Sequence, residues 1–337
     1  MKEILVCPST LQSGHHTYCT TALHHLFQRK KVSHILPFSR TNGSGENKNS
    51  AFNDRSKISI SGVQEKYSLR LEKNILAMTH EHGEYILKPI PADLNNVAFV
   101  PANEHLTMQI AAQVFGIETA KNAMIFYPDG EPAYITKRFD VMPNGKRCLK
   151  EDFASLMQKS SEMGNKNFKY DGSYLQMAET IDRLLPATMI VKERLYRLIV
   201  FNYLFGNGDA HLKNYSVVDY NQDGLYQLAP AYDLVCTRLH IDDGDFALED
   251  RLYDGDYNHP SFAHFGYHAY DDFYDFGIKI GLLPKRISKI LDNFLVHDST
   301  VEDLVRRSFL SEELKEQYML VYGDKRKRLQ QSLRHLI

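Results

Sequence analysis

Two aspartates and an asparagine in the second half of the chain have side chains that could bind a metal ion and activate a hydroxyl group. Asp209 and Asn214 lie in the segment Gly206-Asn207-Gly208-Asp209-Ala210-His211-Leu212-Lys213-Asn214, and Asp233 ends the segment Pro230-Ala231-Tyr232-Asp233. Mg²⁺ prefers oxygen ligands of this kind. We therefore expect Asn214 and Asp233 to bind metal, and Asp209 to accept the proton of a substrate hydroxyl.

The spacing of these residues is typical of phosphoryl-transfer enzymes that use Mg²⁺ and ATP. In protein kinases a metal-binding Asn follows the catalytic Asp by five positions, as Asn214 follows Asp209, and another Asp comes downstream. The His-Arg-Asp lead-in of ordinary eukaryotic kinases is absent here. Lys213 occupies a position where kinases often carry a phosphate-binding lysine. His211 could contact a phosphate or orient Asp209, or it could be a structural histidine bonded to a backbone carbonyl.

The first half of the chain contains candidates for binding the nucleotide. The segment Ser59-Ile60-Ser61-Gly62-Val63-Gln64-Glu65-Lys66 could offer backbone N–H groups to phosphates, although a plain hairpin is an equal alternative. Lys88 ends a predicted strand, Tyr85–Pro89, where kinases place the lysine that binds the α- and β-phosphates. Glu104 is its candidate partner. Lys88 could instead be a solvated charge, and Glu104 could be an acidic residue that stabilises the first turn of a helix.

The order of the predicted elements indicates an α+β, bilobal, protein-kinase-like fold. We expect a small antiparallel N-terminal lobe over residues 1–140, and a mostly helical C-terminal lobe over residues 141–337. The strands Ala123–Tyr127 and Pro132–Phe139 flank a turn sequence. Lys137-Arg138-Phe139-Asp140 then crosses between the lobes, where a hinge would contact the adenine of a nucleotide. Residues 41–58 contain almost no apolar side chains and are expected to be a flexible linker.

Other segments are assigned from periodicity and turn residues. The pair Tyr215–Val218 and Leu225–Leu228 is predicted to be a hairpin that positions Asp233. The segment Asp242–Asp256 is expected to be a solvated loop, and Lys325–Arg328 the polar face of a terminal helix. A short strand at Ile4–Cys7 and the following helices are also expected: Thr20–Lys30, Phe153–Met157, Tyr174–Leu185, Glu193–Phe205 and a helical region over Tyr270–Ile337.

Composition limits the protein class. A hydrophobic fraction of 43% and a charged fraction of 24% are ordinary for a soluble globular protein, and a net charge of -2 argues against bulk attraction to nucleic acid. No apolar run approaches a membrane span of roughly 18–20 residues, and the N-terminal apolar segment is too short for a signal peptide. The four cysteines are widely spaced, which favours the cytoplasm. We expect no metal site at the N-terminal histidines, because no cysteine or acid completes a tetrahedral set: His15, His16, His24 and His25.

These motifs together resemble the HipA family of bacterial serine/threonine kinases, which are toxins of toxin–antitoxin modules. The matching segments run in family order: Ser59–Lys66, Ile86–Pro89, Asn103-Glu104, Arg138–Asp140, Gly206–Asn214 and Tyr232-Asp233. The resemblance implies ATP and Mg²⁺ as cofactors. The implied ATP-binding residues are Ser61, Gly62, Val63, Gln64, Lys66, Lys88, Glu104, Lys137, Phe139, Asp140 and His211. The implied catalytic residues are Asp209, His211 and Lys213, and the implied metal ligands are Asn214 and Asp233.

The region before Ser59 departs from the family pattern. Full-length HipA proteins carry an extra N-terminal subdomain there, whereas this chain looks like the shorter HipT type. In that type the subdomain is a separate protein, HipS, encoded beside the DNA-binding antitoxin HipB. The resemblance implies partners like HipS and HipB, an aminoacyl-tRNA synthetase as substrate, and silencing by autophosphorylation of Ser59, Ser61 or both. A phosphoserine adds about -1.5 to -2 charge and would repel the nucleotide from this loop.

Two other functions compete with a protein kinase. Small-molecule phosphotransferases share the Asp…Asn…Asp arrangement, but the Ser59–Lys66 segment argues against that class. A nucleotide-binding subunit that acts only in a repressor complex would not need the complete set of catalytic residue types that the chain contains. We expect no direct DNA binding by this chain and no membrane association.

Overall fold

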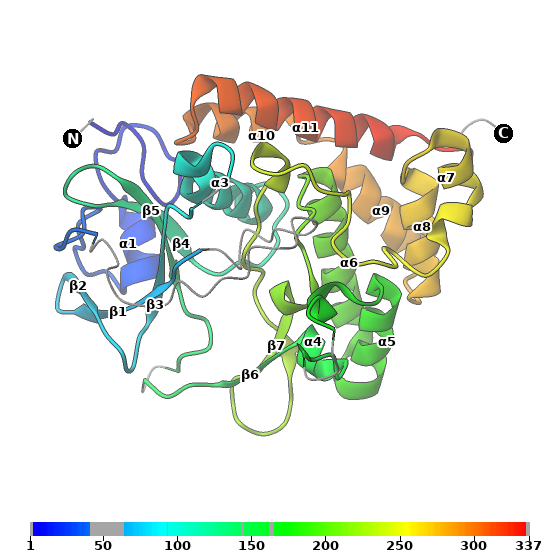
Figure 1. The fold of residues 1–337 in the computed structure, drawn as a ribbon, viewed down its shortest axis with the longest axis horizontal. Helices are drawn as coiled ribbons and strands as arrows, with labels where there is room; N and C mark the ends of the chain where they lie inside the picture. The colour runs from blue at the N-terminus through cyan, green and yellow to red at the C-terminus, as the bar shows by residue number, and fades with distance from the viewer. Residues whose placement is uncertain (1–2, 41–63, 93, 143–144, 162–164, 335–337) are drawn as a thin grey trace.

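A five-stranded antiparallel sheet packs beside a larger helical region in the computed structural model, which describes residues 3–40, 64–92, 94–142, 145–161 and 165–334 (Figure 1). The strand order is β2-β1-β3-β5-β4, and every neighbouring pair is antiparallel. The predicted combination of helices with an antiparallel sheet is therefore confirmed. The strands are β1 (Tyr67–Glu72), β2 (Ile75–Met78), β3 (Tyr85–Pro89), β4 (Asn122–Phe126) and β5 (Pro132–Lys137).

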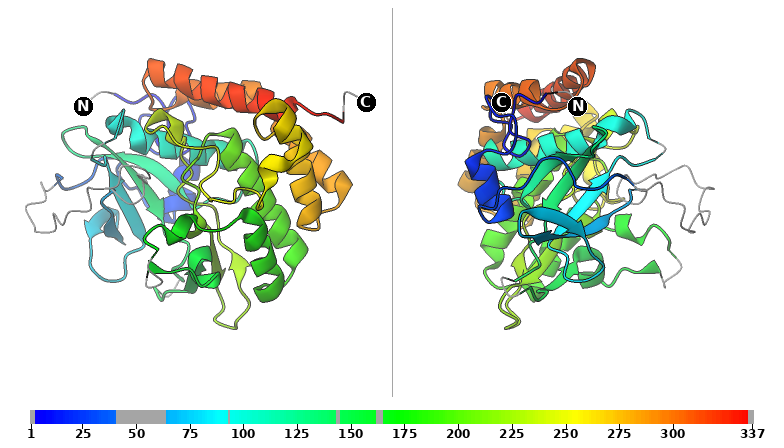
Figure 2. Two further views of the ribbon diagram at one scale, coloured as in Figure 1. Left: turned by 45° about the vertical axis from the view of Figure 1, so that its right-hand side comes forward. Right: turned by 90° about the vertical axis from the view of Figure 1, so that its left-hand side faces the viewer.

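The two faces of this sheet bury different sets of side chains. Because side chains alternate along a strand, Tyr85 and Leu87 of β3 point to one face and Lys88 to the other. The first face packs against α1 (Thr20–Phe27), which Figure 2 shows in blue at one side of the sheet. The second face packs against α3 (Val100–Gln113). β3 therefore presents Lys88 toward α3.

The segment before α1 differs from the prediction. Ile4–Cys7 does not form a strand, and only a single bridge joins Val6 to Ser13. The N–H of Cys7 bonds to the carbonyl of Gln12 at 2.8 Å. This local turn satisfies the backbone without a neighbouring strand, so a short apolar run alone did not indicate pairing.

The helical region is built around α6 and shares one continuous core with α3. Aromatic rings link distant helices in this core: Phe115 stacks on Phe294 at 4.8 Å, and Phe205 stacks on Tyr322 at 5.0 Å. Figure 1 shows α11 running along the top of the molecule. The helices are α4 (Phe153–Leu156), α5 (Tyr174–Leu184), α6 (Thr188–Leu204), α7 (Pro260–Phe265), α8 (Tyr270–Lys279), α9 (Pro284–Phe294), α10 (Asp298–Arg307) and α11 (Glu312–Gln330). The 3-10 turns are η1 (Val97–Phe99), η3 (Phe168–Tyr170), η4 (Leu212–Asn214), η5 (Thr237–Leu239) and η6 (Asp256–Asn258).

A second sheet contains the predicted hairpin. β7 (Ser216–Asp219) pairs antiparallel with β8 (Gln227–Leu228), and the carboxylate of Asp219 accepts the N–H of Gly224 in the turn at 2.8 Å. A third strand, β6 (Leu149–Asp152), pairs with β7 and was not predicted. Its first three residues are exposed, so the sequence does not alternate between buried and exposed residues as a half-buried strand does. The strand forms because β7 supplies its hydrogen-bond partners.

The segment Asp242–Asp256 is more buried than the predicted solvated loop. Leu248 and Leu252 are in the core, and Asp256 is 1% exposed. Asp245 pairs with Lys325 and, at 3.4 Å, with Arg328 of α11. Lys325 is buried rather than on a solvated polar face, because this carboxylate compensates its charge.

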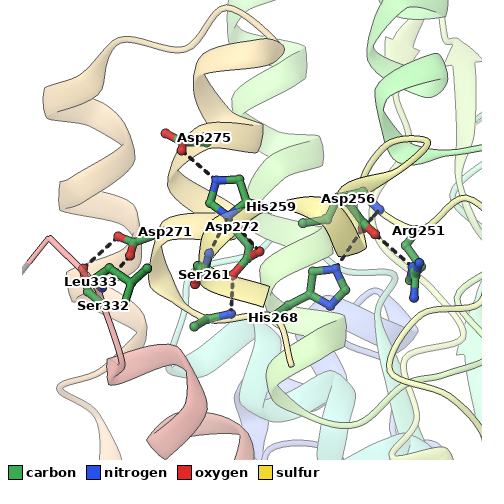
Figure 3. Close-up of polar contacts among 12 residues, drawn as sticks. Arg251, Asp256, His259, Ser261, His268, Asp271, Asp272, Asp275, Ser332 and Leu333 are labelled. Carbon is green, nitrogen blue, oxygen red and sulfur yellow. Dashed lines mark hydrogen bonds and ion pairs between the residues drawn. The ribbon is translucent and has the colours of Figure 1, made fainter. Parts of the chain in front are cut away.

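His259 connects the segment before α8 to that helix through two carboxylates, and a second histidine–carboxylate pair lies within the segment (Figure 3). His259 lies 3.2 Å from Asp272 through Nδ1 and 2.9 Å from Asp275 through Nε2. His268 Nε2 lies 2.8 Å from Asp256 Oδ2. The His268–Asp256 bond gives a partner to two side chains that are 2% and 1% exposed. In the described part of the chain, every helix falls short of the length and apolarity that a membrane crossing requires.

Candidate active site

A cleft of about 460 Å³ lies where the first sheet, the chain leading to β6 and the turns around η3 and η4 meet. Nine of the residues singled out in the sequence line it: Lys66, Lys88, Lys137, Phe139, Asp140, His211, Lys213, Asn214 and Asp233. Lys88, Asn214 and Asp233 also line a second cavity of about 20 Å³. Three more of the predicted site residues line this cavity: Gln64, Glu104 and Asp209. Tertiary structure therefore brings together residues from both halves of the chain.

Lys88 is the centre of a buried ion-pair cluster in this cleft. Its Nζ lies 2.6 Å from Oε1 of Glu104 and donates to Oδ1 of Asp233. The side chains of Lys88 and Glu104 are each 5% exposed. Glu104 lies in the second turn of α3, which begins at Val100, so the alternatives of a solvated lysine and a first-turn acid are wrong.

The charges in this cluster stabilise one another. Burial by itself raises the pKa of Asp233, but Lys88 and Lys66 outweigh this effect and lower that pKa to about 2. Burial by itself lowers the pKa of Lys88, and the two carboxylates raise it above its ordinary value. The pKa of Glu104 is raised, mainly by burial. Asp233 is therefore an anion at neutral pH and Lys88 a cation, as ligands of Mg²⁺ and phosphate need to be.

Short-range hydrogen bonds shape the loop that carries Asn214. The Oδ1 of Asn214 accepts the N–H of His211 at 3.2 Å, while its Nδ2 lies 3.4 Å from Oδ2 of Asp233. Asp233 adopts a left-handed backbone conformation with φ 56. The N–H of Gly208 donates to the hydroxyl of Thr237 at 2.9 Å. These bonds fix Asn214 and Asp233 beside each other.

Asp209 and His211 lie next to each other, with His211 lining the cleft and Asp209 lining the small cavity beside it. His211 Nε2 is 3.9 Å from Asp209 Oδ1, and the same oxygen accepts the hydroxyl of Tyr170 at 3.0 Å. Burial, together with the nearby Lys169, lowers the pKa of His211 to about 3, so the imidazole is neutral. Within the described ranges, neither ring nitrogen makes a hydrogen bond of ordinary geometry.

The last residue of β5, Lys137, and the connection after it, with Phe139 and Asp140, lie along the cleft. The rings of Phe139 and Tyr232 are 5.6 Å apart and form an aromatic wall. The carboxylate of Asp140 accepts two hydrogen bonds from Arg138, at 3.0 and 2.6 Å. Asp140 is therefore engaged by its neighbour in this structure.

Sequence reasoning missed several residues of the cleft. Phe168 and Lys169 line it from η3, and Lys150 lines it from β6. Lys150 Nζ lies 5.1 Å from the ring centre of Tyr232. η3 has only three residues, too short for any period, and β6 has no strand pattern. Only the folded chain shows these contacts.

Part of the expected nucleotide loop lies outside the described residues: Ser59, Ser61, Gly62 and Val63, with the expected linker 41–58. The described part resumes at Gln64, whose Nε2 donates to the carbonyl of Pro89 at 2.9 Å. This bond connects the end of the loop segment to β3 beside Lys88.

The donor atoms of Asn214 and Asp233 fit Mg²⁺, since both supply oxygen ligands. Within the described ranges, no three His, Cys, Asp or Glu side chains gather as a metal site. Mg²⁺ bound with substrate phosphates commonly uses only one or two protein carboxylates and retains waters. One carboxylate with one amide is consistent with that mode of binding.

Comparison with known proteins identifies the family. Residues 58–300 match the family of HipA-like C-terminal domains. The chain belongs to this family. A putative kinase of Haemophilus influenzae is 28% identical over 322 residues, which are 91% of each protein. A putative kinase of Sinorhizobium fredii is 32% identical over 207 residues, 57% of this chain and 48% of the relative, so the chain spans about half the length of that protein.

Two solved structures share the fold of this chain. HipA of Shewanella oneidensis, in a complex with HipB and operator DNA, has a TM-score of 0.63 at 18% identity, and the match covers 82% of this chain and 66% of that chain. The proinflammatory kinase CtkA of Helicobacter pylori has a TM-score of 0.51 at 16% identity, covering 77% and 93%. The predicted HipA-like kinase fold is confirmed, and the HipT subtype stays a prediction.

Proposed function

We propose that this HipA-like protein is an ATP- and Mg²⁺-dependent serine/threonine protein kinase. The observation that carries the proposal is the meeting of Lys88, Glu104 and Asp233 in one buried cluster beside Asn214 and Asp209. Strand β3, helix α3 and two separate loops supply these residues. Kinases require this combination of a phosphate-binding lysine, its glutamate partner, metal ligands and a carboxylate base.

Each side chain has a distinct role in the proposed reaction. The bond between the γ-phosphorus and its bridging oxygen to ADP breaks, a bond to the substrate hydroxyl oxygen forms, and Asp209 accepts the hydroxyl proton. Lys88 and Lys213 donate to phosphate oxygens, and Glu104 orients Lys88. Asn214 and Asp233 would hold Mg²⁺, which would neutralise charge on the β- and γ-phosphates.

The proposal extends to a toxin of the HipT type, with residues 1–140 and 141–337 as its two lobes. The substrate is then an aminoacyl-tRNA synthetase in the cytoplasm, and phosphorylation of Ser59 and Ser61 silences the enzyme. A HipB-like antitoxin and a HipS-like small protein are its partners. Support for an antitoxin partner comes from the HipA of Shewanella oneidensis, whose structure contains HipB and operator DNA.

Intact mass spectrometry tests the proposal directly. Purified wild-type protein incubated with Mg²⁺ and ATP is expected to gain phosphoryl groups, and site mapping is expected to find them on Ser59 or Ser61. Asp209→Asn and Asp233→Asn are expected to remain unmodified. If the wild type labels neither itself nor any synthetase, the protein-kinase proposal is wrong. Transfer to a sugar or aminoglycoside without protein labelling would instead favour a small-molecule phosphotransferase.

A further inference from the structure

Tyr170 contacts the proposed base from a short turn that the motifs do not include. Its hydroxyl donates to Oδ1 of Asp209 at 3.0 Å, and its side chain is buried at 5% exposure. We propose that Tyr170 is a positioning residue that sets the orientation and basicity of Asp209 during phosphoryl transfer. This inference rests on the proposed function, because it assigns to Tyr170 an effect on the base of that reaction.

The backbone holds Tyr170 in place on both sides. Its N–H donates to the carbonyl of Asn167 at 2.9 Å, and its carbonyl accepts the N–H of Glu249 at 2.9 Å. The ring makes an edge contact with His211, with centroids 5.3 Å apart and an interplanar angle of 74°. A phenol fixed in this way has little freedom to follow a rotating carboxylate. It therefore restrains the rotation of Asp209.

A hydroxyl donor on a carboxylate has two chemical effects. A charge-assisted hydrogen bond is roughly twice as strong as a neutral one, so it fixes the plane in which the carboxylate oxygens lie. It also favours the charged form of the carboxylate, which keeps the base deprotonated at lower pH. Because catalysis falls steeply when a reacting group moves by about 1 Å, loss of this bond should affect turnover more than nucleotide binding.

A purely structural role is the competing explanation for the same contact. A buried tyrosine hydroxyl needs a partner wherever it lies, and a carboxylate satisfies it. Tyr196 provides a matched control, since its hydroxyl is also buried and donates to the carbonyl of Phe273 at 3.0 Å, away from the cleft. Both Tyr→Phe changes remove one buried hydroxyl and keep the ring.

The test compares Tyr170→Phe with Tyr196→Phe in the full chain, with autophosphorylation rates measured across pH and across Mg·ATP concentration. We expect Tyr170→Phe to lower kcat by about 10-fold to 100-fold. We expect its KM for ATP to stay within roughly 2-fold, since the bond that it removes touches the base and not the nucleotide-binding lysine. The acid limb of its pH profile should move to higher pH, whereas Tyr196→Phe should leave all three quantities unchanged.

Each of the other possible outcomes overturns the inference, and one of them also overturns the proposed function. Unchanged kcat and pH profile in Tyr170→Phe overturns the inference and leaves the proposed function intact. An equal fall in both variants also overturns it, because a general loss of packing then explains the effect. Absence of transfer by the wild type overturns the proposed function and the inference together. If Tyr170→Phe does not fold, 3-fluorotyrosine at position 170 is the second variant, because it keeps the ring and makes the hydroxyl a stronger donor. The acid limb of the pH profile must then move to lower pH. An unmoved acid limb overturns the inference.

Discussion

His211 illustrates how burial sets the state of a single side chain. It is 2% exposed and its pKa is lowered to about 3 by burial and by Lys169. Its imidazole is therefore neutral through the pH range in which most enzymes work. At the residue scale, His211 contributes a neutral ring beside Asp209 rather than a titrating acid or base.

This environment predicts a pH-dependent stability. Below about pH 6.5 the unfolded chain protonates this histidine, whereas the folded chain does not until about pH 3, so the free energy of unfolding falls as pH decreases through that window. His211→Gln is expected to flatten the dependence, by up to about 1.4 kcal/mol per pH unit, in urea denaturation between pH 4 and 7. The exposed His264→Gln serves as control. Identical slopes in wild type and His211→Gln would contradict the prediction.

Gly208 leaves no room for a side chain beside the proposed base. A Cβ at this position would lie 2.4 Å from Oδ2 of Asp243 and 2.4 Å from the carbonyl oxygen of Gly244. Gly208→Ala must shift the loop and is expected to cost about 1–3 kcal/mol in urea denaturation and to lower phosphorylation at least 10-fold. Gly323→Ala, where nothing lies within 4 Å, should be neutral or stabilising. Full activity in Gly208→Ala would show that the loop adapts.

At the element scale, α3 connects the first sheet to the segment that follows Asp233. The amide of Asn103 donates to the carbonyl of Cys236 at 2.8 Å and accepts the N–H of the same residue at 3.0 Å. Lys88 reaches Glu104 on the next position of the helix. One helix therefore sets the distance between the β3 lysine and the proposed metal ligand.

Asn103→Leu should separate these elements. The N–H of Cys236 would lose its partner in a fully buried site, and its carbonyl would keep the N–H of Leu239 at 3.3 Å. Each unsatisfied buried group costs about 1–3 kcal/mol. We expect a total loss of about 2–4 kcal/mol in chemical denaturation, with weaker ATP binding. Gln113→Ala, an exposed change at the end of the same helix, should cost much less. A loss for Asn103→Leu no larger than that control would refute this role for α3.

The segment between η6 and α8 depends on a buried histidine. Removing His268 leaves the carboxylate of Asp256, 1% exposed, with Arg251 at 3.0 Å as its remaining ion-pair partner in the described structure (Figure 3). His268→Ala is expected to lower the free energy of unfolding by about 2–4 kcal/mol. The exposed His264→Ala, on α7, is the control in the same urea titration. A change below about 1 kcal/mol for His268→Ala would show that the pair is not needed.

At the scale of the whole molecule, the end of the chain closes the helical region. Asp271 of α8 accepts the hydroxyl of Ser332 and the N–H of Leu333, both at 2.7 Å (Figure 3). Tyr318 of α11 lies 2.9 Å from Thr107 of α3 through their hydroxyls. α11 thus connects the C-terminal helices to the helix that carries Glu104, so the cleft and the distant helices should unfold together.

Ligand binding at the cleft should therefore stabilise the whole chain. Mg·ATP at 100 times its Kd would add about 2.7 kcal/mol, which corresponds to a rise of several degrees in Tm. Excess EDTA and the Asp233→Asn change should each reduce the rise, whereas Asp209→Asn should retain it, because Asp209 is not a proposed ligand. Differential scanning calorimetry measures all four conditions. An equal rise with and without Mg²⁺ would argue against Asn214 and Asp233 as metal ligands.

The sequence by itself determined the parts of the site that depend on local geometry. Within the step from Asp209 to Asn214, the N–H of His211 donates to the side-chain oxygen of Asn214, and alternation along β3 decides which face Lys88 occupies. Turn residues were enough to predict the hairpin before Asp233. These local features depend only on residues that are close in the sequence, so the sequence alone is enough to predict them.

Only the tertiary structure decided the contacts that join distant segments. The hydroxyl of Tyr170 donates to Asp209, and Asp245 forms an ion pair with the buried Lys325. Strand β6 forms because β7 lies beside it. The local sequence contains no periodic pattern that would predict these contacts. Each is stabilised by a partner from another part of the chain and by exclusion of water. Thus the sequence indicated which residues are candidates for the chemistry, while folding determined which neighbours contact them.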